Sequence, residues 1–221
     1  MNEKMFCFQC EQTAGCTACT GNAGACGKKS DTAELQDKLT GTLIGLANVA
    51  ERNRDHVTEE TDRLVINCLF STLTNANFNN ETILALLDKA EAEKKRLVSL
   101  CHLCSPKCDK ANAYDMHELW NSDEDIRSLK SLILFGIRGI AAYAYHADVL
   151  GYRDADVNQF FYKALSAIGT KEWGMDELLP IVMKVGAINL KCMALLDKAN
   201  TETYGNPTPT EVNLTVEKGP F

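Results

Sequence analysis

Apolar residues recur every three or four positions along most of this chain, which is the spacing that places side chains on one face of an α-helix. Six runs with this spacing are separated by polar stretches. Alternation of apolar and polar positions, the pattern of a half-buried strand, is nearly absent. The sequence therefore predicts an all-α fold. The six helices are expected at about residues 31–50, 64–73, 81–98, 122–150, 157–169 and 178–199.

Particular residues mark the ends of these predicted helices. Asp31 followed by Glu34 predicts a capping box at the start of the first helix, because such a pair satisfies exposed amide groups there. Gly151 stands where the fourth helix needs a C-terminal cap. Pro180 is compatible with the sixth helix only in its first turn, where a missing amide breaks no helical hydrogen bond.

The predicted helices fall into two sets of three. We expect two three-helix bundles, at residues 31–98 and 122–203, joined by an irregular connection at 99–121. Residues 1–30 are rich in Gly, Ala and Thr and poor in large apolar residues, so they are expected to form a loop without a core of its own. Residues 204–221 contain prolines and then a short alternating run, which predicts a linker toward a missing α/β domain.

Composition and charge narrow the classes of partner. The chain has 221 residues, of which 45% are apolar and 24% charged, as in an ordinary globular protein. Its net charge of −7 repels phosphate backbones, so we expect no nucleic-acid partner. No run of about 18 uncharged apolar residues is present, so no membrane partner is expected. The most apolar stretch, at 131–150, contains Arg138, His146 and Asp148 and is predicted to be a buried helix.

Half of the ten cysteines lie within the first 26 residues. They are Cys7, Cys10, Cys16, Cys19 and Cys26. The start of the chain lacks the apolar core of a signal peptide, so a cytoplasmic location is expected, where clustered thiols are ligands more often than disulfides. Because thiolates hold zinc and iron–sulfur clusters, the sequence predicts a metal or cluster site in this loop.

The spacing of these cysteines leaves alternatives open. Cys7 with Cys10, and Cys16 with Cys19, form C-x2-C pairs, while Cys26 lies among glycines that permit a tight turn. A tetrahedral site uses four ligands, so one thiol is spare, and spacing does not decide between Cys16 and Cys19. A zinc site or redox-active thiols remain alternatives to an iron–sulfur cluster.

A second, weaker candidate site consists of Cys101, Cys104 and Cys108, with His102 between them. Three thiolates and an imidazole form a known type of zinc site. The direct adjacency of Cys101 and His102 argues against a shared metal, because neighbouring residues rarely reach the same ion. Redox-active thiols and unreactive cysteines are the other interpretations of this group.

Other residues that could carry chemistry are interpreted as structural. Cys68 and Cys192 lie on apolar helical faces and are expected in the core. Outside the second cysteine group, no histidine stands at ligand spacing from a cysteine. A capping or packing role is expected for His146, and packing roles are expected for Trp120 and Trp173.

Several segments of the chain resemble one protein family. CFQCEQTA at 7–14, CTG at 19–21 and GACGK at 24–28 are similar to the start of the hybrid cluster proteins, also known as prismane proteins or hydroxylamine reductases. The likeness continues in DTAELQDKL at 31–39 and in YGNPTPTEVN at 204–213. The resemblance therefore extends from the first cysteines to the final linker.

The resemblance implies a helical N-terminal domain of two three-helix bundles that carries a [4Fe–4S] cluster, or in some members a [2Fe–2S] cluster. The family's cysteine pattern selects four ligands in this chain: Cys7, Cys10, Cys19 and Cys26. Cys16 then becomes the spare thiol, and the short middle gap favours the [4Fe–4S] form. Six residues separate the last two ligands, which departs slightly from the family's pattern.

In this family, two α/β domains follow and bind a hybrid iron–sulfur–oxygen cluster, where hydroxylamine is reduced to ammonia and water. Family members are more than twice as long as this chain. The resemblance therefore implies an N-terminal electron-transfer domain that is not catalytic alone. Its expected partners are an electron-donor protein or reductase and the C-terminal α/β domains of the parent chain. The alternatives are a zinc-stabilised helical interaction module and a thiol redox sensor.

Overall fold

The computed structural model describes residues 5–10, 17–74, 76–101 and 112–210 of the chain. Within these ranges the chain is helical and contains no strand longer than a single bridge, so the predicted all-α fold is confirmed. The elements are α1 (Ser30–Ala50), the 3₁₀ turn η2 (Arg54–His56), α2 (Glu59–Ser71), α3 (Asn80–Leu100), α4 (Met116–Trp120), α5 (Glu124–Val149), α6 (Ala155–Gly169) and α7 (Met175–Tyr204).

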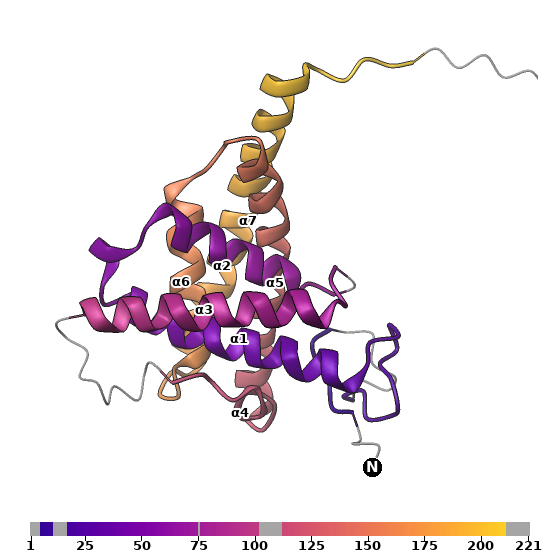
Figure 1. Ribbon diagram of the computed structural model, residues 1–221, viewed down its shortest axis with the longest axis vertical. Coiled ribbons are helices and arrows are strands. Elements are labelled where there is room, and N and C mark those ends of the chain that lie inside the picture. Colours follow the sequence, from indigo (N-terminus) through magenta and orange to yellow (C-terminus); the bar gives the residue numbers. More distant parts are fainter. Residues whose placement is uncertain (1–4, 11–16, 75, 102–111, 211–221) are drawn as a thin grey trace, which may run out of the picture.

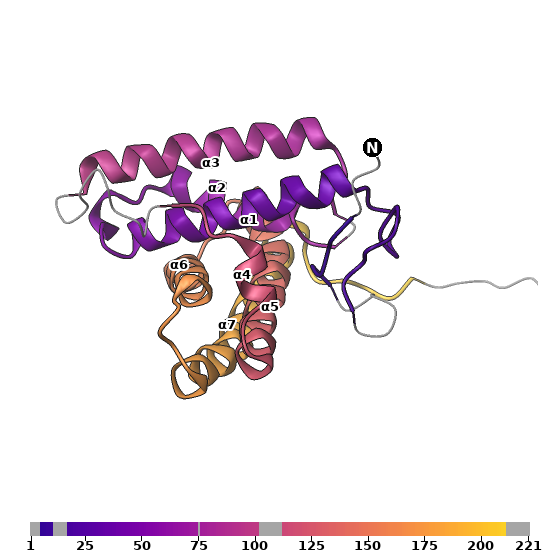
Figure 2. The same cartoon turned by 90° about the horizontal axis from the view of Figure 1, so that it is seen from below.

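The long helices form two layers that cross each other (Figure 1, Figure 2). α1, α2 and α3 make up one layer, and α5, α6 and α7 the other. Within the layers α1 packs on α3 and α5 on α7, and between them α1 packs on α6 and α2 on α5. One hydrophobic core runs through both layers. The arrangement is compatible with the two predicted sets of three helices.

α1 lies at the centre of this packing, because α3 covers one of its sides and α6 another. Its Leu39, Leu43 and Ile44 are fully buried. Gly41 lets the segment before α4 approach closely, since the Tyr114 amide donates to the Gly41 carbonyl at 3.0 Å. A Cβ atom at Gly41 would lie 2.1 Å from the Tyr114 carbonyl oxygen. The backbone ahead of α4 is therefore fixed directly on α1.

The predicted capping box of the first helix is wrong. α1 begins one residue before Asp31, and its N-cap, Lys29, makes no side-chain cap bond. Asp31 is already helical, and its carboxylate accepts hydrogen bonds from the Thr32 amide and from Asn80 at the start of α3. Glu34 instead forms an exposed ion pair one turn further on, with a lysine of the same helix.

The sixth predicted helix also begins earlier than its apolar pattern indicates. α7 starts at Met175, where the Gly174 amide donates to the Glu177 carboxylate at 2.9 Å. Pro180 is therefore the sixth residue of the helix, and the prediction that it lies in the first turn is wrong. Because proline has no amide hydrogen, the Asp176 carbonyl lacks its usual helical donor at this position.

Three other expectations concern the connections. Gly151 follows α5 with a φ of 83°, in the left-handed region that favours glycine, so the predicted C-terminal cap is confirmed. The connection at 99–121 contains α4, whose Met116 and Leu119 are buried. Five residues are too few to show a helical period, which is why the sequence pattern misses this helix. The alternating run after residue 210 lies outside the described residues.

α7 is the one described helix that is long and apolar enough to cross a membrane, with a mean hydropathy of 1.6 over its best window. Only 22% of that window is buried. Its exposed apolar side chains are Met175, Leu179, Met183, Leu190 and Met193. A single helix of this kind is weak support for a membrane location, so the absence of a membrane partner stays a prediction.

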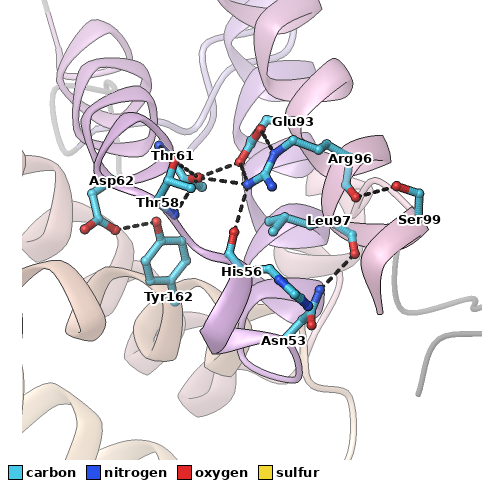
Figure 3. Close-up of polar contacts among 10 residues, drawn as sticks. All are labelled: Asn53, His56, Thr58, Thr61, Asp62, Glu93, Arg96, Leu97, Ser99 and Tyr162. Carbon is cyan, nitrogen blue, oxygen red and sulfur yellow. Dashed lines mark hydrogen bonds and ion pairs between the residues drawn. The ribbon is translucent and has the colours of Figure 1, made fainter. Parts of the chain in front are cut away.

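Partly buried polar contacts join the two layers in addition to the apolar core (Figure 3). The Tyr162 hydroxyl on α6 donates to one oxygen of the Asp62 carboxylate on α2 at 2.7 Å, and Asn158 donates to the other at 3.0 Å. Burial raises the pKa of Asp62, and these two hydrogen bonds oppose that shift. Within the first layer, Arg96 on α3 donates to the His56 carbonyl at 2.9 Å.

The bond from Tyr162 to Asp62 gives a test of the contact between the layers. A hydrogen bond to a charged group contributes about 1.5–3 kcal/mol, so we expect Tyr162→Phe to lower the free energy of unfolding by about 2 kcal/mol. Tyr152→Phe is the control, because Tyr152 donates to the exposed carboxylate of Glu202 at 2.7 Å and should change stability by less than about 0.5 kcal/mol. Urea denaturation followed by circular dichroism measures both. Equal effects would contradict the interlayer role of Tyr162.

The close packing of α5 on α7 gives a second test. A Cβ atom at Gly136 would lie 2.3 Å from Cγ1 of Val185, whereas a Cβ atom at Gly139 on the same helix meets nothing within 4 Å. We expect Gly136→Ala to lower the free energy of unfolding by about 1–3 kcal/mol through overpacking. Gly139→Ala should raise it by about 0.5–1 kcal/mol, because alanine favours the helix. A stabilising Gly136→Ala would show that this contact is not tight.

Candidate metal centre

The cysteine loop is held by a short backbone pairing at one end of the first layer (Figure 2). The Cys7 amide donates to the Cys19 carbonyl at 3.1 Å, and the Cys19 amide donates to the Cys7 carbonyl at 2.7 Å. A further bond of 3.3 Å joins the Met5 amide to the Gly21 carbonyl. This antiparallel bridge places Cys7 and Cys19, which are distant in sequence, side by side.

A tight turn holds the segment of Cys26 near Met5, at the start of the loop. The Gly24 amide donates to the Lys28 carbonyl at 2.8 Å, and Gly27 adopts a φ of 83°. A Cβ atom at Gly24 would lie 3.3 Å from Cε of Met5 and 3.5 Å from Sγ of Cys26. The small residue at this position therefore lets the turn with Cys26 pack against the start of the loop.

The predicted ligands differ in exposure. Cys7 is buried, Cys10, Cys19 and Cys26 are half-buried, and none of these four forms a disulfide. Cys16 lies outside the described residues. In the part of the chain that the structure describes, no three His, Cys, Asp or Glu side chains gather closely enough to hold a metal ion. The loop brings the thiols into one region, and their assignment as ligands stays a prediction.

A buried lysine lies behind the cysteine loop. Lys28 is 3% exposed, and its ammonium group donates to the side-chain oxygens of Gln9 at 2.6 Å and Gln36 at 2.5 Å. Burial lowers the pKa of Lys28, and the neighbouring Cys7 and Cys26 oppose that shift. The two thiols therefore favour the charged form of this lysine when they are ionised.

A buried arginine reaches the loop from the second layer. Arg138 on α5 is 2% exposed, and its guanidinium donates to the hydroxyls of Thr40 at 3.0 Å and Thr72 at 3.1 Å. A longer bond of 3.4 Å goes to the backbone carbonyl of Gln9, between the first two cysteines. Arg138 thus connects α1, the end of α2 and α5 to the cysteine loop.

The charges around the loop are unequal in number. Burial lowers the pKa of Arg138 to about 10, with Asp37, Cys7 and Cys10 opposing the shift, so the guanidinium is charged at neutral pH. Asp37 accepts a hydrogen bond from the Gln9 amide group at 2.7 Å, and burial raises the pKa of Asp37 to about 6. Among the described residues, this network therefore contains two cations, Lys28 and Arg138, and one carboxylate, Asp37, which leaves a positive excess among these groups.

Aromatic side chains attach the loop to α4. Phe6 stacks on His117 with ring centroids 5.0 Å apart, and its edge meets Trp120 at 5.5 Å. Phe8 lies 5.1 Å from the same indole ring. The packing roles predicted for Trp120 and Trp173 are confirmed, because both pack against the core. The position of His117 beside the cysteine loop has no signal in the sequence.

The second cysteine group lies largely outside the described residues. Cys101 is buried at the end of α3. His102, Cys104 and Cys108 fall in the range that the structure does not describe, so a zinc site or redox pair there stays untested.

The core roles of Cys68 and Cys192 are confirmed, since both are fully buried. Burial raises the pKa of Cys68 to about 12 and that of Cys192 to about 11, so both remain neutral thiols. The predicted packing role of His146 is confirmed as well, because its ring lies 5.6 Å from those of Phe70 and Tyr145.

The sequence pattern finds the cysteines but misses the groups behind them. Gln9 lies between the first two cysteines, and Lys28 ends the GACGK segment. Both residues are part of recognisable motifs, but the motifs do not indicate that these two side chains form a buried polar network beside the thiols. Arg138 has a clearer signal, because it is a charged residue within a long apolar stretch, at 131–150. A charge in such a position requires a buried partner.

Comparisons with known proteins agree on one family. The chain matches the model of the Prismane/CO dehydrogenase family over residues 5–221. It is 40% identical to a protein named hydroxylamine reductase from Porphyromonas gingivalis, across all of this chain and 43% of that protein. A protein of the same name from Chlorobaculum tepidum is 43% identical, across 98% of this chain and 42% of the relative.

A third relative, again named hydroxylamine reductase and from Methanocella arvoryzae, is 38% identical across 97% of this chain and 44% of its own length. The chain thus spans less than half the length of the curated relatives it matches.

Proposed function

The chain belongs to the Prismane/CO dehydrogenase family, and from this premise we propose that it is the N-terminal iron–sulfur electron-transfer part of a hydroxylamine reductase. The observation that carries the proposal is the construction of the cysteine loop. A backbone bridge pairs Cys7 with Cys19, a glycine turn packs the segment of Cys26 against Met5 at the start of the loop, and the cations Lys28 and Arg138 are buried beside the loop. Clustered thiolates with compensating charge are suited to hold an iron–sulfur cluster.

Four cysteines would hold a [4Fe–4S] cluster in this proposal: Cys7, Cys10, Cys19 and Cys26. The donor set fits such a group chemically, because these thiols form no disulfide and because the buried cations offset the negative charge of four thiolates. When bound, the cluster would supply a carrier for one electron at a time.

The residues of the chain position the loop and limit its contact with water. Phe8 and Ala18 of the loop belong to the main hydrophobic core, so the loop is anchored on the helical layers. Phe6 and Trp120 cover one side of it. The thiols of Cys10, Cys19 and Cys26 are only half-buried, which would leave a short path for an electron from a docked donor protein.

The complete reaction belongs to the parent protein. We propose that its further α/β domains, absent from this chain, receive the electrons at a hybrid iron–sulfur–oxygen cluster and reduce hydroxylamine to ammonia and water in the cytoplasm. This chain alone is then not catalytic. Its partners are a reduced electron-donor protein on one side and those α/β domains on the other.

The ligand assignment is tested by single cysteine variants of the chain, purified without oxygen. We expect about four iron and four sulfide atoms per chain in the unchanged protein. Replacement by alanine at any of the four proposed ligands should remove most of the iron, because the remaining thiolates cannot complete the site. Cys16→Ala and the core variant Cys68→Ala should retain it. Iron, acid-labile sulfide and zinc are measured for each.

Two results would contradict this proposal in different ways. Full iron in Cys19→Ala together with loss in Cys16→Ala would make Cys16 the third ligand. About one zinc per chain without iron or sulfide would favour the structural zinc module instead.

A further inference from the structure

The cation behind the cysteine loop has unusual partners. Arg138 comes from α5 in the second layer, and the three hydrogen bonds that its guanidinium makes go to uncharged oxygens, those of Thr40, Thr72 and Gln9. A buried charge with neutral acceptors is unfavourable unless an anion lies close enough to compensate it. The position of Arg138 therefore requires an anion near the loop.

The buried ammonium group of Lys28 likewise requires a nearby anion. Its ammonium group is bound by the amide oxygens of Gln9 and Gln36, and neither acceptor carries a charge. Among the described residues, Asp37 is the one carboxylate hydrogen-bonded in this network, through the amide group of Gln9. A single carboxylate does not compensate two cations, so one positive charge remains among these described groups.

The thiols of the loop are the groups that match this remaining charge. Arg138 interacts electrostatically with Asp37 first, and then with Cys7 and Cys10. Lys28 interacts with Cys7 and Cys26 first, and then with Asp37. Both cations therefore act on Cys7, the most buried of these cysteines, and each acts on one further proposed ligand.

We propose that Arg138, together with Lys28, is a positioning residue for the cysteine loop that also raises the reduction potential of the cluster bound there. The bond to the Gln9 carbonyl fixes the backbone between Cys7 and Cys10, and the guanidinium charge acts on the thiolates of both. This inference rests on the proposed function, since it concerns the iron–sulfur cluster of the same loop.

The direction of the effect follows from charge. A cluster with four thiolate ligands carries negative charge, and reduction by a donor adds one electron without forming or breaking a bond to the protein. Positive charge nearby stabilises the reduced, more negative form over the oxidised one. In the water-poor interior this interaction is stronger than at the surface. Removing the charge should therefore make the cluster harder to reduce.

The test compares three variants of the anaerobically purified chain. Arg138→Met removes the charge, Arg138→Lys retains it while losing the planar donors, and Lys28→Met removes the second cation. Iron and sulfide are measured first. The midpoint potential is then determined at pH 8 by redox titration followed by EPR, a pH at which Asp37, with a pKa of about 6, is ionised throughout.

Lys130→Met is the matched control on the same helix. Lys130 is also buried, and its ammonium group donates to the Thr170 carbonyl at 2.8 Å, but its electrostatic neighbours are Glu118 and Lys171 and no cysteine. Lys130→Met should leave the midpoint potential of the cluster unchanged. If any disturbance of α5 changed the potential, Lys130→Met would shift it as Arg138→Met does.

We expect Arg138→Met to lower the equilibrium constant for reduction of the cluster at least tenfold, which corresponds to a midpoint potential about 59 mV lower for a one-electron couple. Arg138→Lys should stay closer to the unchanged protein, and Lys28→Met should shift in the same direction as Arg138→Met. A fully loaded Arg138→Met with an unchanged potential, or an equal shift in Lys130→Met, would overturn the inference.

If Arg138→Met does not retain the cluster, the loaded Lys28→Met and Arg138→Lys variants decide. An unchanged midpoint potential in Lys28→Met refutes the electrostatic role. A midpoint potential in Arg138→Lys that is lower by the full shift expected for loss of the charge refutes it as well, because lysine keeps the charge. Absence of iron and sulfide from the unchanged chain is a separate result. It refutes the proposed function, and the inference with it, before any variant is compared.

Discussion

The buried guanidinium of Arg138 is the interaction on which the two helical layers and the cysteine loop jointly depend. It is contributed by α5, it is bound by hydroxyls of α1 and of the residue that ends α2, and it reaches the backbone of the loop 129 positions away in the sequence. A charge at this depth is tolerated only if its donors are satisfied and an anion lies near. The helices and the loop must therefore adopt compatible positions around it, and in our proposal the thiolates of the loop supply the further negative charge beside Asp37.

Close backbone contacts provide the scaffold that makes this arrangement rigid. α1 is buried along most of its length, and Gly41 lets the segment before α4 lie directly on it. Gly136 plays the corresponding role between α5 and α7. The loop has little apolar surface of its own, so Phe8 and Ala18 attach it to the core that the helices form.

Much of the fold follows from the helical period of the apolar residues, because amphipathic helices of three or more turns show it clearly. The errors occur where other interactions set the boundary. α1 begins with Lys29 as its N-cap, so the Asp31 and Glu34 pattern does not cap it, and α7 begins at a Gly174–Glu177 contact that precedes its apolar face. α4 is too short to show a period at all.

The candidate site also contains features that the sequence predicts and features that it does not. Cysteine spacing is visible in the sequence, whereas the arginine near the thiols comes from the distant helix α5 and is positioned by tertiary packing. Lys28 lies in the loop itself, but its contact with Gln36 of α1 also arises only from the fold. Arg138 is recognisable as a charge within an apolar stretch, but nothing in its neighbourhood along the chain indicates that the first cysteines are its partners. Gln9, which joins both cations to Asp37 and to the backbone of the loop, has no sequence signal of that role.

The central claim is that the thiols of this loop together bind one reducible iron–sulfur cluster. The most direct measurement is the EPR spectrum of the anaerobically purified chain before and after reduction with dithionite. The account predicts a signal of a reduced iron–sulfur cluster that appears on reduction and disappears on reoxidation. A chain that is silent in both states, and colourless, would contradict it.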